Sequence, residues 1–290
     1  MPNSADRPRT LEAVAQQMLE RNHFDAEPQV DALVAAMRER FGDAIYAIVL
    51  YGSFTRGQRD TLLDLYVLMS DLQVLPGFHQ LLARLPPNVY HVNVDGVRAK
   101  VAVMTFEQLE RGVQRDVAPY FCARFAQPSA MVYARDGEAR SRFVRLVANA
   151  AARLYFASAA DPYSPEESAA FWEQTFRLTY GAELRSEKES RYRTLYDANP
   201  QYFDAIHHAL AHQPVGPATS WRARRVMGKL LSFSRLFKSA FTFDDPVDYL
   251  LWKIERHSGV RETATPLQHR YPLIFAWPLV WRLYRKGAFR

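Results

Sequence analysis

The stretch LYGSFTRGQRDTLLDLYVLM, residues 50–69, holds the pattern that decides the fold. It begins inside one short apolar, β-branched run at 44–51 and ends with a second run at 62–69. Runs of this length predict two buried strands, and the segment between them, rich in Gly and polar residues, predicts a turn. We expect a helix to start directly after Gly52-Ser53. The sequence therefore brings a glycine, a hydroxyl group and the carboxylate of Asp64 toward one end of a sheet.

The rest of the chain predicts a mixed α/β protein. Strands are expected at 89–94 and 97–104, joined by the hairpin dipeptide Asp95-Gly96, and at 130–133. Apolar periodicity predicts helices at 8–22, 29–41, 106–115, 118–126, 137–158, 165–185, 200–212, 222–241 and 246–257. Because strands are concentrated in the first half, we predict two domains, residues 1–160 with the sheet and residues 161–290 mainly helical.

Composition excludes several classes of protein. At 290 residues, 48% hydrophobic and 23% charged, the chain is expected to fold and to be soluble. No apolar run approaches the roughly 18–20 residues of a membrane span, and the start lacks an apolar signal core, so we expect neither an integral nor a secreted protein. A single cysteine, Cys122, excludes an internal disulfide and a Cys-rich zinc site and suits a reducing compartment.

Charge is distributed unevenly along the chain. The net charge is +6, but residues 221–290 carry 14 Lys/Arg against 5 Asp/Glu, a balance of +9. Residues 1–220 carry the remaining 23 basic and 26 acidic side chains, a balance of −3. The basic end is thus a separate feature, suited to an anionic partner.

Gly52, Ser53 and Asp64 suggest phosphate chemistry. A glycine lets phosphate approach the backbone closely, and a serine hydroxyl and helix N-terminal amides can donate to its oxygens. A carboxylate on the next strand can hold Mg²⁺ against the same phosphates. This arrangement resembles the nucleotidyltransferase superfamily pattern, although Tyr66 stands where the second carboxylate of that pattern is expected. The alternative is a plain strand-to-helix turn with an ordinary polar residue at a strand edge.

A narrower family also lacks the second acid. The chain resembles the mitochondrial-type, translocator-maintenance CDP-diacylglycerol synthases and their bacterial relatives over roughly residues 44–260. The matching positions are Gly52, Ser53 and Gln58 in Gly-Ser-x-x-x-x-Gln, Leu63-Asp64-Leu65, Phe78-His79 for a Trp-His pair, Arg98-Ala99-Lys100-Val101 for Lys-Tyr-Gly-Val, and Tyr120, Ala123, Arg124, Phe125 and Pro128 for Tyr-x-x-Gly-Arg-Leu-x-x-Pro. Ala123 replaces a glycine and Phe78 a tryptophan.

The resemblance implies a nucleotidyltransferase-fold mixed sheet and a phosphatidate cytidylyltransferase, with CTP and phosphatidic acid as substrates and Mg²⁺ as cofactor. It implies catalytic roles for Asp64 and Lys100, a metal-binding role for Asp64, and nucleotide binding by Gly52, Ser53, Gln58 and Arg124. The residues alone leave two questions open, each with two possible answers. Lys100 and Arg98 share one strand face, which either lines the cleft or is a solvated edge. Arg124 lies in an apolar, aromatic helix and needs an anionic partner, either a phosphate or an internal carboxylate.

The basic end predicts a membrane-surface role. Val226, Leu230, Phe233 and Phe237 share one helix face, and the end FAWPLVWRLYRKGAFR, residues 275–290, mixes aromatic and basic residues. Such a helix either docks on a core or lies on an anionic bilayer, and a lipid substrate favours the bilayer. No nucleic-acid partner is expected, because no aromatic RNA-binding strand or zinc module accompanies the charge. We therefore expect a cytoplasmic protein, peripheral on the inner face of a membrane, or on the matrix side if eukaryotic.

Two other functions fit the same motifs. The chain could act on a soluble acceptor, such as an antibiotic, a sugar phosphate or tRNA. It could also be a non-catalytic nucleotide-binding protein, as the tyrosine in place of the second acid permits.

Overall fold

The computed structural model describes residues 6–22, 24, 27–59, 61–184, 190–242, 251, 262–270 and 277–286. In this part of the chain, five strands form one sheet in the order β3-β4-β2-β1-β5. They are β1 (Ile45–Tyr51), β2 (Leu63–Met69), β3 (Asn88–Val94), β4 (Val97–Thr105) and β5 (Ala130–Ala134). β2 and β4 are parallel and the other neighbouring pairs are antiparallel, so the sheet is mixed. The predicted α/β fold class with a mixed sheet and a mainly helical remainder is confirmed.

The described α-helices are α1 (Asp6–Arg21), α2 (Pro28–Phe41), α3 (Gly77–Leu82), α4 (Phe106–Arg115), α5 (Tyr120–Phe125), α6 (Gly137–Ala159), α7 (Ser168–Gly181), α8 (Ser190–Asp197), α9 (Pro200–Leu210), α10 (Trp221–Thr242), α12 (Pro266–Arg270) and α14 (Trp277–Arg285). Two short 3-10 turns, η1 (Gly42–Ala44) and η2 (Phe54–Arg56), flank β1. The helix predicted at 246–257 lies outside the described residues, apart from residue 251.

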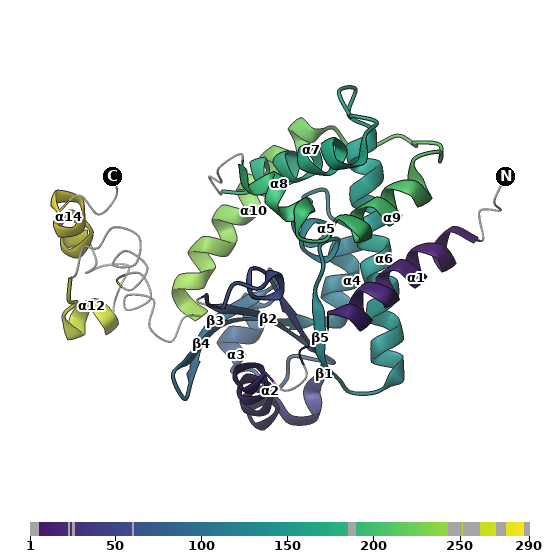
Figure 1. Cartoon of the computed structure of the whole chain (residues 1–290). Helices are drawn as coiled ribbons and strands as arrows, with labels where there is room; N and C mark the ends of the chain where they lie inside the picture. Colours follow the sequence, from purple (N-terminus) through teal and green to yellow (C-terminus); the bar gives the residue numbers. More distant parts are fainter. Residues whose placement is uncertain are drawn as a thin grey trace.

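The sheet has two covered faces. Along β2, Leu63, Leu65 and Val67 pack with α2, whereas Tyr66 and Leu68 join a cluster with α1, α4, α5 and α6. Figure 1 shows α2 on one side of the sheet and these four helices on the other. Strand side chains alternate between faces, so two buried faces explain why β2 is apolar almost throughout.

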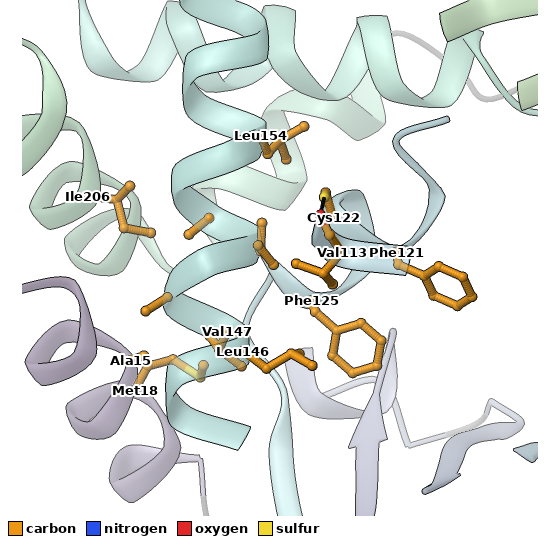
Figure 2. Packing of buried hydrophobic residues seen from close by; sticks show 14 of the residues in the cluster. Ala15, Met18, Val113, Phe121, Cys122, Phe125, Leu146, Val147, Leu154 and Ile206 are labelled. Carbon is orange, nitrogen blue, oxygen red and sulfur yellow. Dashed lines mark hydrogen bonds between the residues drawn. The ribbon is translucent and has the colours of Figure 1, made fainter. Parts of the chain in front are cut away.

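α5 is fixed above β2 by a dense apolar cluster. Figure 2 shows Phe121, Cys122 and Phe125 of α5 among side chains of α4 and α6. The Cys122 thiol donates to the carbonyl oxygen of Val113 over 3.3 Å, and the Phe125 ring lies 4.9 Å from that of Tyr66. This packing fixes the position of α5 over the sheet and therefore also the positions of its polar residues.

The turn between β3 and β4 has the geometry that the sequence predicts. Asp95 and Gly96 have φ angles of 51° and 84°, so both central residues are left-handed. Asp-Gly is favoured there because glycine carries no Cβ and aspartate tolerates a positive φ.

α10 packs beside β3 at the edge of the sheet (Figure 1). Lys238 is only 6% exposed, and its ammonium group holds the loop between α3 and β3. Its Nζ donates to the carbonyl oxygens of Leu82 (3.3 Å), Pro87 (2.7 Å) and Leu85, and to Oδ1 of Asn88 (3.1 Å). A Cβ atom at Gly228 would collide with the carbonyl oxygen of Ala182, so glycine allows α10 to approach the end of α7 closely.

The predicted division at residue 160 stays a prediction. Side chains from α1, α6, α7 and α9 belong to one hydrophobic cluster, which includes Leu11, Leu154, Trp172 and Phe203. Among the described residues, no helix is both long enough and apolar enough to cross a bilayer.

Candidate functional site

The turn after β1 brings Gly52 against Asp64. Gly52 has a φ of 90°, and a Cβ atom built on it would lie 2.8 Å from Oδ2 of Asp64. Both observations require glycine, because an L side chain rarely adopts this φ and would also overlap the carboxylate. The carboxylate of Asp64 therefore lies directly against the bare backbone at the end of β1.

Ser53 and Gln58 belong to one closed turn. The backbone N–H of Gln58 donates to the carbonyl oxygen of Ser53 over 3.2 Å, and the hydroxyls of Ser53 and Thr61 are 3.0 Å apart. The helix that we expected after Gly52-Ser53 is absent from this stretch, where residues 54–56 form the single 3-10 turn η2. Gly57, with a φ of 84°, ends that turn before a helix can develop. The predicted helix N-terminal amides are thus limited to one turn of backbone.

Four polar side chains stand in one row across the sheet. Asp64 is in register with Tyr51 on β1 and with Lys100 on β4, and Lys100 is in register with His91 on β3. Asp64 and Lys100 alternate with residues of the α2 cluster, so both lie on the face toward α5, and both are half-buried. The structure thus brings together the two predicted catalytic residues. Lys100 is therefore not fully solvated, and its predicted place in a cleft stays a prediction.

Tyr66 occupies the position at which the nucleotidyltransferase pattern has its second carboxylate. It is 1% exposed, and its ring lies 4.9 Å from both Tyr51 and Phe125. Burial, reinforced by the neighbouring Tyr120 and Tyr51, raises the pKa of Tyr66 well above its ordinary value. The phenol is therefore neutral at physiological pH, and Tyr66 supports the aromatic layer under α5 rather than supplying a second anionic metal ligand.

Arg124 has an internal partner. Its Nη1 lies 2.8 Å from Oε1 of Glu183, its Nη2 lies 3.3 Å from Oε2, and the two side chains are only 13% and 11% exposed. Burial opposes the guanidinium charge, but Glu183, and after it Tyr120 and Tyr66, hold the pKa of Arg124 well above its ordinary value. Of the two alternatives for Arg124, the structure shows the internal carboxylate. Its predicted contact with a nucleotide stays a prediction.

Tyr120 is a site residue that sequence reasoning did not single out for chemistry. The guanidinium carbon of Arg124 lies 3.7 Å from the centre of its ring, and that of Arg235 lies 4.0 Å from it. Burial disfavours the Tyr120 phenolate, yet the charges of Arg124, Arg235 and Lys100 together lower the pKa of Tyr120. Three cationic groups from β4, α5 and α10 therefore act on the Tyr120 side chain, and one of them, Lys100, belongs to the row that contains Asp64.

Arg235 belongs to the basic end of the chain, residues 221–290. In the structure, its Nε donates to the carbonyl oxygen of Pro86 over 2.9 Å, and its guanidinium lies over Tyr120. The contact joins residues more than a hundred positions apart, so no local pattern could have revealed it.

The residues around Asp64 fit a metal ion that is shared with a substrate. Within the described ranges, no cluster of three or more His, Cys, Asp or Glu side chains could hold a metal alone. Mg²⁺ usually keeps several waters and is bound by one or two carboxylates together with substrate phosphates. One carboxylate beside a bare glycine backbone suits that form of binding.

The apolar face of α10 points outward. Val226, Leu230, Phe233 and Phe237 are 57%, 60%, 63% and 57% exposed. Of the two predicted uses of this face, docking on the core is thus not observed for these four residues. The helix instead turns Arg235 and Lys238 toward the protein.

The chain matches no protein-family model, and no curated protein matches it. Among solved structures, it is similar to a nucleotidyltransferase-like protein from Exiguobacterium sibiricum 255-15. The identity is 12%, the match covers 89% of this chain and 91% of that chain, and the TM-score is 0.29.

Proposed function

We propose that this protein is a nucleotidyltransferase, and specifically that it makes CDP-diacylglycerol and pyrophosphate from CTP and phosphatidic acid. The observation that carries the proposal is the Asp64 carboxylate, held against the Gly52 backbone with Lys100 beside it in register. A carboxylate, an ammonium group and a glycine backbone at the end of a strand suit a triphosphate and its metal ion.

The reaction is an in-line displacement at phosphorus. A phosphate oxygen of phosphatidic acid forms a bond to the α-phosphorus of CTP, and the bond from that phosphorus to the oxygen bridging to the β-phosphate breaks. Pyrophosphate leaves with the electron pair. Because a phosphate monoester is already anionic at neutral pH, the nucleophile needs little deprotonation. This accounts for one carboxylate sufficing where Tyr66 replaces the second.

Five of the six predicted site residues belong to this proposal, and the sixth, Arg124, is paired with Glu183. Asp64 would hold Mg²⁺, which neutralises triphosphate charge when bound. Gly52 and Ser53 approach the phosphates through backbone and hydroxyl, and Gln58 belongs to the same closed turn. Lys100 offsets the negative charge of the substrates and of the leaving group.

A lipid acceptor is supported by the exposed face of α10. This face places large apolar side chains next to basic residues of the same helix, Arg222, Arg225 and Lys229. On α14, Trp281 is 62% exposed and is followed by Arg282. Apolar side chains that enter the headgroup layer, together with basic residues that attract anionic lipids, hold a peripheral protein on a membrane. We therefore also propose a cytoplasmic protein that works at the inner membrane surface.

The deciding experiment follows radiolabelled CTP and pyrophosphate release with Mg²⁺. The acceptors are vesicles containing phosphatidate, vesicles without it, and soluble candidates such as a sugar phosphate or tRNA. We expect labelled CDP-diacylglycerol only with phosphatidate, and no turnover in Asp64→Asn. Asp95→Asn, a carboxylate change at the hairpin tip, serves as the control and should remain active.

Other results would replace the proposal. Turnover with a soluble acceptor alone would assign a different nucleotidyltransferase. CTP binding without pyrophosphate release for any acceptor would indicate a non-catalytic nucleotide-binding protein, the reading that Tyr66 permits. Full activity in Asp64→Asn would remove the proposed site.

A further inference from the structure

A pocket lies outside the row of Asp64 and Lys100. It has a volume of about 230 Å³ and lies between the loop after α3, the helix α4, the start of α5 and the helix α10. A water molecule takes about 30 Å³ in the liquid, so the pocket has room for several waters or for one phosphate group. Three arginines from three different elements line it: Arg84, Arg111 and Arg235.

The lining is strongly positive. Asp116 is the single carboxylate among the lining residues, so three arginines against one acid give a formal charge of +2. Neither Arg84 nor Arg111 forms an ion pair or a side-chain hydrogen bond with any residue that the structure describes. Gln108, also in the lining, is already engaged: its side-chain oxygen accepts from the N–H of Thr105, and its Nε2 donates to the carbonyl oxygen of Ala83. The positive charge is therefore not neutralised from within.

Arg235 adds an observation that points to a ligand. Its Nη1 is buried and has no hydrogen-bond partner among the described residues, although its Nε donates to Pro86. Arg235 lines the pocket, and its guanidinium carbon lies 4.0 Å and 5.3 Å from the centres of the Tyr120 and Phe121 rings. A buried charged donor without an acceptor is unfavourable, and such a group in a folded protein calls for an explanation. An anionic oxygen in the pocket would supply the missing acceptor once the Arg235 side chain turned toward it.

We propose that this pocket binds a phosphate monoester dianion. Its charge of −2 matches the +2 of the lining, and the planar guanidinium fork suits tetrahedral phosphate oxygens better than it suits a halide. The same chemistry is carried by soluble phosphate compounds and by the headgroup of a phosphorylated lipid. The proposal stands on the pocket alone, because the binding can be measured without CTP. Failure of the cytidylyltransferase assay would leave it untouched.

The first test titrates inorganic phosphate into the full chain near pH 8, by calorimetry, against sodium chloride of equal ionic strength. We expect saturable binding at one site, weakened about tenfold or more in Arg111→Gln and in Arg84→Gln, since each loses one charge-assisted contact. Both arginines are exposed, so these variants should fold. Arg115→Gln, an exposed arginine of the same helix outside the pocket, is the matched control and should bind phosphate as the wild type does.

The second arm separates the two sources of phosphate. Vesicles of phosphatidylcholine, with and without phosphatidate, compete against inorganic phosphate for wild type, Arg111→Gln and Arg115→Gln. Competition by phosphatidate that Arg111→Gln alone abolishes supports a lipid headgroup site. Phosphate binding without competition supports a site for soluble phosphate compounds. The proposal is overturned if the wild type shows no saturable phosphate binding, or if Arg115→Gln weakens it as much as Arg111→Gln does.

Discussion

The Oδ2 atom of Asp64 lies 2.8 Å from the point where a Cβ atom on Gly52 would stand. Gly52 thus lies directly against the carboxylate to which the metal-binding role is assigned. Gly57, five residues on, has nearly the same φ, 84° against 90°, yet nothing lies within 4 Å of its Cβ position. A substitution of Gly57 can therefore serve as the control for the same substitution of Gly52.

Replacing either glycine by alanine should lower stability, but only one replacement should affect activity. The positive φ costs an L residue about 1–2 kcal/mol, so Gly57→Ala should lower the free energy of unfolding by about that amount in urea titrations, and Gly52→Ala, which also overlaps Asp64, by at least as much. Only Gly52→Ala also displaces the Asp64 carboxylate. A displacement near 1 Å can reduce a rate about a hundredfold, so turnover of CTP should fall in Gly52→Ala alone. Equal activity in the two variants would show that the contact with Asp64 is not needed.

The buried pair of Arg124 and Glu183 allows its structural and nucleotide-binding roles to be separated. Arg124→Gln leaves Glu183 buried and unpaired, and breaking such a pair costs about 3–5 kcal/mol. Arg124→Gln/Glu183→Gln removes both charges, so most of that stability should return in urea unfolding. If the arginine serves only its internal partner, CTP affinity should return with it, and we expect this result.

A different outcome would restore the prediction made from the motif. Recovery of stability without recovery of CTP affinity would mean that the Arg124 guanidinium contacts the nucleotide as well. CTP titrations of the wild type and of Glu183→Gln under the same conditions complete the double-mutant cycle.

The sequence predicted the parts of the fold that depend on local patterns. All five strands were placed within one residue or so at each end, because β-branched apolar runs of that length suit buried strands. The turn at Asp95-Gly96 followed from its φ requirements alone. Four short helices, α3, α8, α12 and α14, were not predicted. With 6, 8, 5 and 9 residues they are too short to show a clear helical period.

The parts of the candidate site that depend on long-range contacts could not be predicted. Gly52, Ser53 and Asp64 lie within one strand-turn-strand unit, so a motif could identify them together. Tyr120 and Arg235 meet only because α10 returns to the edge of the sheet, and nothing in the local sequence requires it. The same holds for the partner of Arg124, where the sequence called for an anion but left two candidates.

The outward face of α10 should determine membrane binding. Leu230→Ser/Phe233→Ser removes two side chains that are more than half exposed, so the free energy of unfolding should change by less than about 0.5 kcal/mol. Burying each such side chain in a bilayer is worth about 1.5–3 kcal/mol, so co-sedimentation with anionic vesicles should weaken at least tenfold. Tyr163→Ser, which removes an aromatic residue that is 84% exposed in the loop before α7, is the control. Unchanged sedimentation of the double variant would exclude this face as the membrane contact.

Lys238 should make stability depend on pH. Burial, and to a lesser extent the charge of Arg235, lowers the pKa of Lys238 from 10.5 to about 7. Between these values the unfolded chain holds a proton that the folded chain has released. The free energy of unfolding should therefore rise with pH above 7, by up to about 1.4 kcal/mol per pH unit from this group. Below pH 7 the lysine is charged in both states, and its contribution no longer changes.

The measurement compares urea unfolding of wild type and Lys238→Met between pH 7 and 8.5, a window that ends before tyrosine side chains titrate. The difference in free energy of unfolding between the two proteins should change by about 1–2 kcal/mol across this window, because methionine keeps the apolar stem but has no proton to release. Lys229→Met, an exposed lysine of the same helix, should run parallel to wild type. If Lys238→Met also runs parallel, then the oxygens of Leu82, Leu85, Pro87 and Asn88 keep the ammonium charged despite its burial. In that case α10 is held to the loop before β3 by a permanent buried cation.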